Sequence, residues 1–167
     1  MATYNIEVID NFLEKEEFDL IKDRIISNKF PVYYCPCVSL KDEEEHPKHL
    51  NFFHYLYWKH TPQSTVFSTV YDNLISKFDV KALIRCKVNC YPRTDEHIRH
   101  NFHTDVDYSH SAVIFSLNTC NGWTEFEDGT RVESIANRAL IFDASKLHAS
   151  VTCTDQKCRW NIIFNYL

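Results

Sequence analysis

Apolar residues in the first half of the chain switch between strand-like and helix-like spacing. Tyr4 to Ile9 alternates apolar and polar positions, which predicts a short strand. Helical spacing follows and predicts an amphipathic helix over about 12–27, with Asp10 or Asn11 as its cap. A second helix is predicted from Thr61-Pro62, because proline is favoured in a first helical turn. Residues 31–50 are expected to form a loop and residues 51–59 an aromatic-rich strand. The second helix is expected to end at about residue 77.

From Ala82 onward the pattern changes to short strands separated by turns. The turn pairs Asn121-Gly122 and Asp128-Gly129 lie between strands. Two helices followed by about eight strands predict a mainly β (α+β) fold, an antiparallel double-sheet barrel with the helices on one sheet. The eight predicted strands are Leu83–Tyr91, Phe102–Val106, Ser111–Asn118, Trp123–Phe126, Thr130–Ile135, Ala139–Phe142, Ala149–Thr152 and Cys158–Tyr166.

Length and composition favour one ordered domain. The chain has 167 residues, which suits a single domain over 1–167 with support in 1–81 and the β core in 82–167. Aromatic residues make up 14% of the chain, which favours β structure over disorder. The formal net charge is −5 and the densest charge run, residues 42–45, is acidic, so we expect no nucleic-acid partner and a solvated loop at that run.

The cysteines and the N-terminus indicate a cytoplasmic protein without a membrane segment. The seven cysteines are odd in number and form no C-x-x-C motif, so reduced thiols are expected rather than a disulfide framework or a zinc ribbon. The N-terminus lacks a basic region followed by an apolar stretch, and no apolar run approaches the length of a membrane span.

Three residues form a candidate metal site. His103 and Asp105 are two apart, so on a strand they would project from the same face. His148 follows a predicted strand and a short turn, and can add a second imidazole. Two histidines and one carboxylate on one face of a metal leave positions open, which suits non-haem Fe(II) oxygen chemistry. Asp107 and Asp143 are rival carboxylates: Asp107 has the same strand parity but lies farther from His103, and Asp143 is expected to shape a turn.

Arg159 is the candidate anion-binding residue. It opens the last apolar run, where a buried cation is costly unless it has a partner. A guanidinium at this place can hold a carboxylate beside the metal through two hydrogen bonds. Arg138 is the competing arginine, and its place before a strand predicts a role in a turn or on an outer face.

The segment from about Leu83 to the end resembles the 2-oxoglutarate- and Fe(II)-dependent dioxygenase superfamily, and most of all its prolyl 4-hydroxylase-like branch. The order and spacing of His103-x-Asp105, His148 and Arg159 match the iron triad and the 2-oxoglutarate arginine of that family. Other stretches that match family motifs are Val88-Asn89-Cys90-Tyr91-Pro92, Phe115-Ser116-Leu117-Asn118, Gly122-Trp123-Thr124-Glu125-Phe126 and Asn137-Arg138-Ala139-Leu140-Ile141-Phe142.

The resemblance implies a double-stranded β-helix (jelly-roll, cupin-like) core with the two N-terminal helices packed on the major sheet. It implies that this sheet contains the strands beginning at Leu83, Ser111, Ala139 and Cys158. The implied cofactors are Fe(II), 2-oxoglutarate and dioxygen, with His103, Asp105 and His148 on the metal and Arg159 on the distal carboxylate of 2-oxoglutarate. Further implied cosubstrate-binding residues are Tyr91, Asn89 and Thr124.

Several positions depart from the family pattern. Phe115 stands where several prolyl hydroxylases have a tyrosine that binds 2-oxoglutarate, so Thr124 or Tyr91 is expected to supply the missing donor. Asn121 replaces the first glycine of a G-G pair, and asparagine also tolerates left-handed turns. Asn89-x-Tyr91 is similar to a motif of the oxidative demethylases of alkylated nucleic acids. The second arginine of that branch would fall on Asn165, which disfavours that assignment.

The resemblance implies hydroxylation of a C–H bond with release of succinate and CO2. A prolyl residue of a peptide or protein is the first expectation for the substrate. A free amino acid or another small molecule is the alternative, as is a cupin-like metal-binding or sensing module without turnover. We expect residues 31–60 and 93–102 to form the mouth of the site. The aromatic side chains that could hold a peptide ring there are Tyr33, Tyr34, Tyr55, Tyr57 and Trp58.

Overall fold

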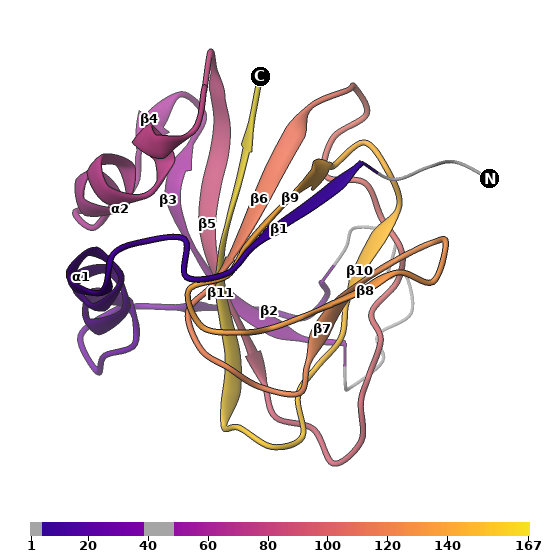
Figure 1. The fold of residues 1–167 in the computed structure, drawn as a ribbon. Coiled ribbons are helices and arrows are strands. Elements are labelled where there is room, and N and C mark those ends of the chain that lie inside the picture. Colours follow the sequence, from indigo (N-terminus) through magenta and orange to yellow (C-terminus); the bar gives the residue numbers. More distant parts are fainter. Residues whose placement is uncertain (1–4, 39–48) are drawn as a thin grey trace.

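The computed structural model describes residues 5–38 and 49–167, which form two β-sheets and two α-helices (Figure 1). The acidic run at residues 42–45 lies outside the described residues. The helical segments are α1 (Lys15–Ile25), α2 (Phe67–Asn73) and the 3₁₀ turn η1 (Ile75–Lys77). The strands are β1 (Ile6–Ile9), β2 (Tyr33–Cys35), β3 (Asn51–Trp58), β4 (Thr61–Pro62), β5 (Leu83–Pro92), β6 (Ser111–Ser116), β7 (Trp123–Phe126), β8 (Arg131–Glu133), β9 (Ala139–Asp143), β10 (His148–Ser150) and β11 (Cys158–Tyr166).

The larger sheet has eight strands and is antiparallel throughout its pairings. Its order is β1-β9-β6-β11-β5-β3-β2, and β4 pairs with β3. This order confirms that the strands beginning at Leu83, Ser111, Ala139 and Cys158 share one sheet, where they lie next to one another. The smaller sheet has the order β10-β7-β8.

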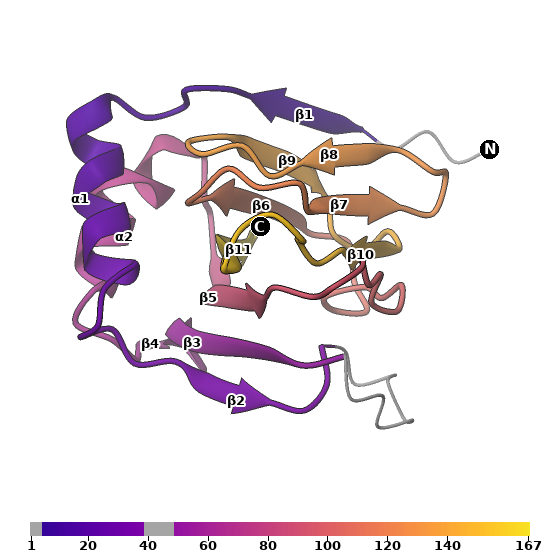
Figure 2. The same cartoon turned by 90° about the horizontal axis from the view of Figure 1, so that it is seen from below.

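The larger sheet has a helix-facing side and a side that faces the smaller sheet (Figures 1 and 2). Ile21, Ile25 and Val70 of the helices share one apolar cluster with β5, β6 and β11. On the other side, Phe126 and Val132 of the smaller sheet pack in a second cluster with β6, β9 and β11. Because side chains alternate along a strand, every second residue of β5 and β11 faces the space between the sheets.

The N-terminal elements differ from their prediction in three respects. The cap of α1 is Glu14, which forms a capping box with Glu17, whereas Asp10 pairs with Arg138 on the outside. Thr61–Pro62 forms the short strand β4 against β3, and α2 begins only at Phe67, because the edge of β3 takes up the expected first turn. The predicted loop also contains the strand β2, which pairs with β3.

The segment around His103 is not the regular strand that its spacing predicts. It makes a single bridge, in which His103 and His148 exchange backbone hydrogen bonds of 3.0 Å. The backbone of Asp105 turns away and donates to the carbonyl of Ala144 at 3.2 Å. The two side chains therefore owe their proximity to long-range pairing with the segment before and within β10.

Asn121, which replaces a motif glycine, and Asn137, the first residue of another motif stretch, differ in backbone conformation. Asn121 does not take a left-handed conformation, so the tolerance expected there is not used. Asn137 takes a left-handed conformation, with φ of 63°. Its side chain accepts a hydrogen bond from the amide of Leu13 and donates one to the carbonyl of Leu13. This asparagine therefore ties the start of α1 to β9.

No helix within residues 5–38 and 49–167 has the length and apolar character needed to cross a membrane.

Candidate metal centre and buried arginine

His103, Asp105 and His148 meet between the two sheets. Oδ1 of Asp105 lies 3.9 Å from Nε2 of His103 and 3.9 Å from Nε2 of His148. All three ligand atoms lie within 4.8 Å of one another. His148 is 3% exposed, and the Asp105 side chain is equally buried. The spacing fits one ion held by two imidazoles and one carboxylate.

Each histidine presents Nε2 because the other ring nitrogen is occupied. Nδ1 of His103 lies 3.1 Å from the carbonyl oxygen of Asn101, and Nδ1 of His148 lies 2.9 Å from that of Lys146. A carbonyl can only accept, so Nδ1 carries the proton and Nε2 is left with a lone pair toward Asp105. Such an outer contact is the usual way in which a metal-binding histidine is oriented.

The charges of the three groups suit a cation. Burial and the neighbouring His148 lower the pKa of His103 to about 4, and burial lowers the pKa of His148. Burial opposes ionisation of Asp105, but Arg85, His148 and the hydrogen bond from Asn165 together hold its pKa well below the usual range. At neutral pH the site therefore offers two neutral imidazoles and one carboxylate.

Asp105 is held by side chains from β5 and β11. Arg85 forms an ion pair with Oδ1, and Asn165 donates to Oδ2 at 2.7 Å. Arg85 also donates from Nε to Oδ1 of Asn165 at 2.6 Å, and the Nδ2 atom of Asn165 lies 3.1 Å from Nε2 of His110. Asn165 and Arg85 are directly opposite each other in the β5–β11 pairing. The carboxylate thus has a fixed orientation before any metal binds.

Arg159 lies on the same inner face, at the other end of the β5–β11 pair. It is 1% exposed, donates from Nη2 to Oγ1 of Thr124 at 3.0 Å, and reaches the carbonyl of Val151 at 3.4 Å. Its Nε has no hydrogen-bond partner, and no acidic side chain in the described parts of the chain forms an ion pair with it. A buried guanidinium in this condition is costly unless an anion completes it.

Polar side chains connect the arginine to the metal-site residues along the strand pair. Tyr91 is opposite Arg159 in register, and its ring lies 5.6 Å from the guanidinium carbon. Its hydroxyl accepts a hydrogen bond from Ser150 of β10 at 2.9 Å. Asn89 donates to Asn161 at 3.1 Å, and Oδ1 of Asn89 is buried with no hydrogen-bond partner in the part of the chain that the structure describes. This oxygen can only accept, so only a ligand with a hydrogen-bond donor would satisfy it.

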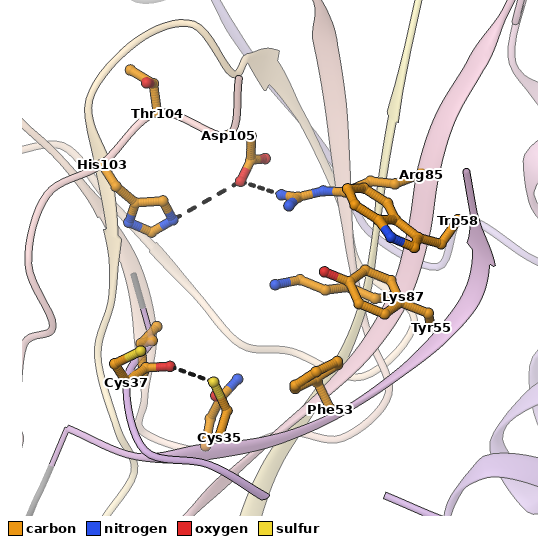
Figure 3. Close-up of a pocket in the computed structure, with 12 residues that line it drawn as sticks. Cys35, Cys37, Phe53, Tyr55, Trp58, Arg85, Lys87, His103, Thr104 and Asp105 are labelled. Atoms are coloured by element: carbon orange, nitrogen blue, oxygen red, sulfur yellow. Dashed lines mark hydrogen bonds and ion pairs between the residues drawn. The ribbon is translucent and has the colours of Figure 1, made fainter. Parts of the chain in front are cut away.

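A pocket of about 470 Å³ opens beside His103 and Asp105 (Figure 3). Arg85 and Lys87 of β5 form one side. Beside them Tyr55 and Trp58 of β3 stack on each other, with 4.9 Å between their ring centroids. The other lining residues are Cys35, Cys37, Val38, Asn51, Phe53 and Thr104.

The expected mouth is only partly reproduced. Tyr55 and Trp58 line the pocket, but Tyr57 packs with Phe67 in the core that faces the helices. Tyr33 and Tyr34 are about 60% exposed on β2 and do not line the pocket. A bulge in β3 between Tyr55 and Tyr57 explains why Trp58 joins Tyr55 on the inner face. Residues 93–102 do not line the pocket either.

The rival side chains lie elsewhere. Asp107 is exposed. Asp143 accepts a hydrogen bond from the backbone amide of Ser145 at 3.0 Å and shapes a turn, as predicted. Arg138 forms a two-pronged ion pair with Asp10, as expected for an outer position.

Phe115 does not stand at the position of a cosubstrate donor. Its ring packs edge-on against Phe12 and Phe18 on the helix-facing side. Ser116, the next residue of β6, points to the other side and accepts a hydrogen bond of 3.3 Å from Ser134. The alternation of β6 decides this, so the expected gap at Phe115 does not arise.

Four site residues were missed by the sequence reasoning: Arg85, Lys87, Asn161 and Asn165. The alternation of β5 from Tyr91 and of β11 from Arg159 places them on the inner face. That signal was present in the sequence, but which of them reach Asp105 depends on the pairing register.

A second group with metal-ligand side chains consists of Cys120, Cys153 and Asp155. Asp155 is exposed and accepts a hydrogen bond from the backbone amide of Asn121. All seven cysteines lie within the described residues, and none forms a disulfide.

Comparison of structures shows that the chain has the fold of 2-oxoglutarate oxygenases. A Pseudomonas putida prolyl-4-hydroxylase matches with a TM-score of 0.63 and 13% identity, over 99% of this chain and 94% of that chain. A Trichoplax adhaerens prolyl hydroxylase, solved with a hypoxia inducible factor peptide fragment, matches with a TM-score of 0.64 and 18% identity, over 99% of this chain and 84% of that chain. HygX from Streptomyces hygroscopicus, solved with nickel and 2-oxoglutarate, matches with a TM-score of 0.66 and 11% identity, over 98% of this chain and 83% of that chain. No protein-family model matches the sequence, and no curated protein matches it significantly.

Proposed function

We propose that the chain is an Fe(II)- and 2-oxoglutarate-dependent dioxygenase that hydroxylates a C–H bond and releases succinate and CO2. The observation that carries this proposal is a buried arginine on the same strand pair that fixes a His-Asp-His group, and no acidic residue within 5–38 and 49–167 pairs with this arginine. The likeness in fold to prolyl hydroxylases and HygX supports it. We infer a single domain over 1–167 whose two sheets are the halves of a double-stranded β-helix.

The residues present fit the implied metal. His103, Asp105 and His148 supply two neutral nitrogen ligands and one oxygen ligand, the donor set of non-haem Fe(II) oxygenases. Their ligand atoms converge, and both Nδ1 atoms are already paired. When bound, iron with 2-oxoglutarate and dioxygen supplies the oxidising power for the hydroxylation.

The residues present also fit 2-oxoglutarate. Arg159 binds its distal carboxylate, and Thr124 holds the guanidinium in place through Nη2. Tyr91 covers the arginine with its ring. Asn89 could contact the dianion only through Nδ2, because 2-oxoglutarate has no donor for the Asn89 oxygen. The role of this chain is to bind and orient the cosubstrate and to exclude water from the strand pair.

A prolyl residue in a peptide or protein is the first substrate that we propose. A Trichoplax adhaerens neighbour was solved with a peptide fragment, which supports this class. A small molecule is the second candidate, because another neighbour, HygX, was solved with hygromycin B bound. A metal-binding module without turnover is disfavoured, because it gives the buried Arg159 no function.

The test is succinate formation from 2-oxoglutarate with Fe(II), measured with and without a panel of prolyl peptides and free amino acids. We expect metal-dependent succinate formation and the mass gain of one oxygen atom in a panel member. Metal binding without any succinate formation, with or without the panel, would favour the module.

A further inference from the structure

Lys87 is a cation in the pocket that the proposed cosubstrate site does not use. Its side chain extends from β5 into the pocket, between the aromatic side chains of β3 and His103 (Figure 3). In the described parts of the chain, no hydrogen bond or ion pair satisfies its ammonium group. Arg85 is different, because Asp105 and Asn165 already hold its guanidinium.

Among the residues that the structure describes, the pocket lining has one positive charge in excess. Arg85 and Lys87 are cationic and Asp105 is anionic, and His103 binds a metal only as a neutral imidazole. Fe(II) and the dianion of 2-oxoglutarate, both part of the proposed function, add no net charge together, and Arg159, which lies outside this lining, adds one further positive charge. An anion beside Lys87 would therefore offset part of an excess of positive charge in a half-buried site.

The wall next to Lys87 is aromatic. Tyr55 is the register partner of Lys87 on β3, and Tyr55 stacks on Trp58 with an angle of 19° between the rings. Phe53 lies one inner-face position along β3, next to Asn89 in register. An apolar body thus has a surface to pack on, directly beside a cation that can take a charged end.

We propose that Lys87 is the specificity-determining residue of the substrate pocket and binds a carboxylate of the substrate, whose apolar part packs on Tyr55 and Trp58. The proposal rests on the proposed function and names its substrate class, an acid with an apolar body. The carboxylate comes from a free amino acid or from an acidic residue in a peptide, and the chemistry at Lys87 is the same.

The cosubstrate is the other anion that could contact Lys87. Its distal carboxylate is assigned to Arg159, which is opposite Tyr91, four residues along β5 from Lys87. Four residues of an extended strand span roughly 13 Å. Lys87 lies instead two residues from Arg85, in the pocket that contains His103 and Asp105. This separation favours the substrate.

The experiment compares wild type, Lys87→Met and Lys87→Arg, with Lys29→Met as the matched control because Lys29 is exposed after α1. Succinate formation is measured with two pairs of probes: L-proline against L-prolinamide, and one prolyl peptide with aspartate beside the proline against the same peptide with asparagine. We expect the acid of one pair to have a KM about tenfold or more below its neutral partner in wild type, given the strength of a charge-assisted hydrogen bond. Lys87→Met should lose that preference, and Lys87→Arg should retain most of it.

Succinate formed without any probe reports on the cosubstrate alone. Under these conditions Lys87→Met should have the same KM for 2-oxoglutarate as the control Lys29→Met. A raised KM for 2-oxoglutarate would assign Lys87 to the cosubstrate and overturn the proposal, as would a preference for the acids that survives in Lys87→Met.

A binding measurement needs no turnover. Lysines are dimethylated with ¹³C-formaldehyde and a hydride reductant, which retains their charge. The Lys87 resonance of the Zn²⁺-loaded protein is then followed by NMR as each probe is added. We expect the acid of a probe pair to shift this resonance and the neutral probe of that pair to leave it unchanged. Acids that neither shift it nor lower KM would overturn the proposal. Absence of succinate under all conditions would instead refute the proposed function, while the resonance would still report on the anion site.

Discussion

Asn165 donates a hydrogen bond of 2.7 Å to Oδ2 of Asp105, the carboxylate oxygen other than the one that lies 3.9 Å from the two histidines. The position at which a nucleic-acid demethylase would carry its second arginine therefore orients a proposed metal ligand here. Its neighbour Arg85 adds an ion pair to the same carboxylate.

Asn165→Leu should weaken metal binding. The change removes the donor to Asp105 and leaves Oδ2 without this partner, so we expect a loss of about 10- to 100-fold in affinity, as for other residues that orient metal ligands. Calorimetric titration with Ni²⁺ measures it. Asn73→Leu on α2 is the control and should bind Ni²⁺ as wild type does. Equal affinity in both variants would show that Arg85 alone orients the carboxylate.

His103→Ala, Asp105→Asn and His148→Ala should each abolish metal-dependent succinate formation. Each histidine change removes one ligand, and Asp105→Asn removes the negative charge of the third without a change in shape. Circular dichroism and thermal melting show whether the fold is retained. The exposed Asp107 gives the control: Asp107→Ala should retain activity. The reverse result, with Asp107 essential and Asp105 dispensable, would move the carboxylate ligand to Asp107.

Arg159→Lys should raise the KM for 2-oxoglutarate about tenfold or more while Ni²⁺ binding stays nearly unchanged. An ammonium cannot reproduce the planar two-pronged contact with a carboxylate, and each charge-assisted hydrogen bond contributes roughly 1.5–3 kcal/mol. Arg138→Lys is the control, because Arg138 pairs with Asp10 on the outside. An unchanged 2-oxoglutarate dependence in Arg159→Lys would remove the main support for a 2-oxoglutarate enzyme.

Gly122→Ala should impair both stability and 2-oxoglutarate binding. A Cβ atom there would lie 2.8 Å from the carbonyl oxygen of Val151 and 3.0 Å from Cδ of Arg159, so the arginine must move. We expect a lower Tm together with a higher KM for 2-oxoglutarate. At Gly129 the added Cβ has no atom within 4 Å, but φ is +88°. Gly129→Ala should therefore cost roughly 1–2 kcal/mol of stability without any effect on KM.

The kcat/KM for an acid substrate should fall as pH rises through about 8. Burial and the nearby Arg85 lower the pKa of Lys87 to about 8, against the opposing effect of Asp105 and Cys35. Lysine is charged below its pKa, so carboxylate binding is complete at lower pH and is lost above it. Arginine stays charged at this pH, so Lys87→Arg should abolish the fall of kcat/KM above pH 8, the alkaline limb of the profile. A limb that persists in Lys87→Arg would belong to another group.

The sequence by itself determined the local elements and the set of reactive residues. Alternation and helical spacing are local properties, so β5, β6, β9 and β11 were predicted at nearly their observed bounds, and α1 within a few residues. The order His103, Asp105, His148 and Arg159 is also readable from the chain, because each residue type has chemistry of its own.

The tertiary structure alone decided which residues meet. Asp105 reaches the histidines through an irregular segment that a single bridge to His148 holds in place, and no local pattern encodes such a bridge. Arg85 and Asn165 converge on Asp105 because β5 and β11 pair in one particular register, and a shift of one residue would turn them to the helix side. Pairing register is set by contacts between residues far apart in the chain, and for that reason the surroundings of the site, Lys87 included, became visible only in the folded molecule.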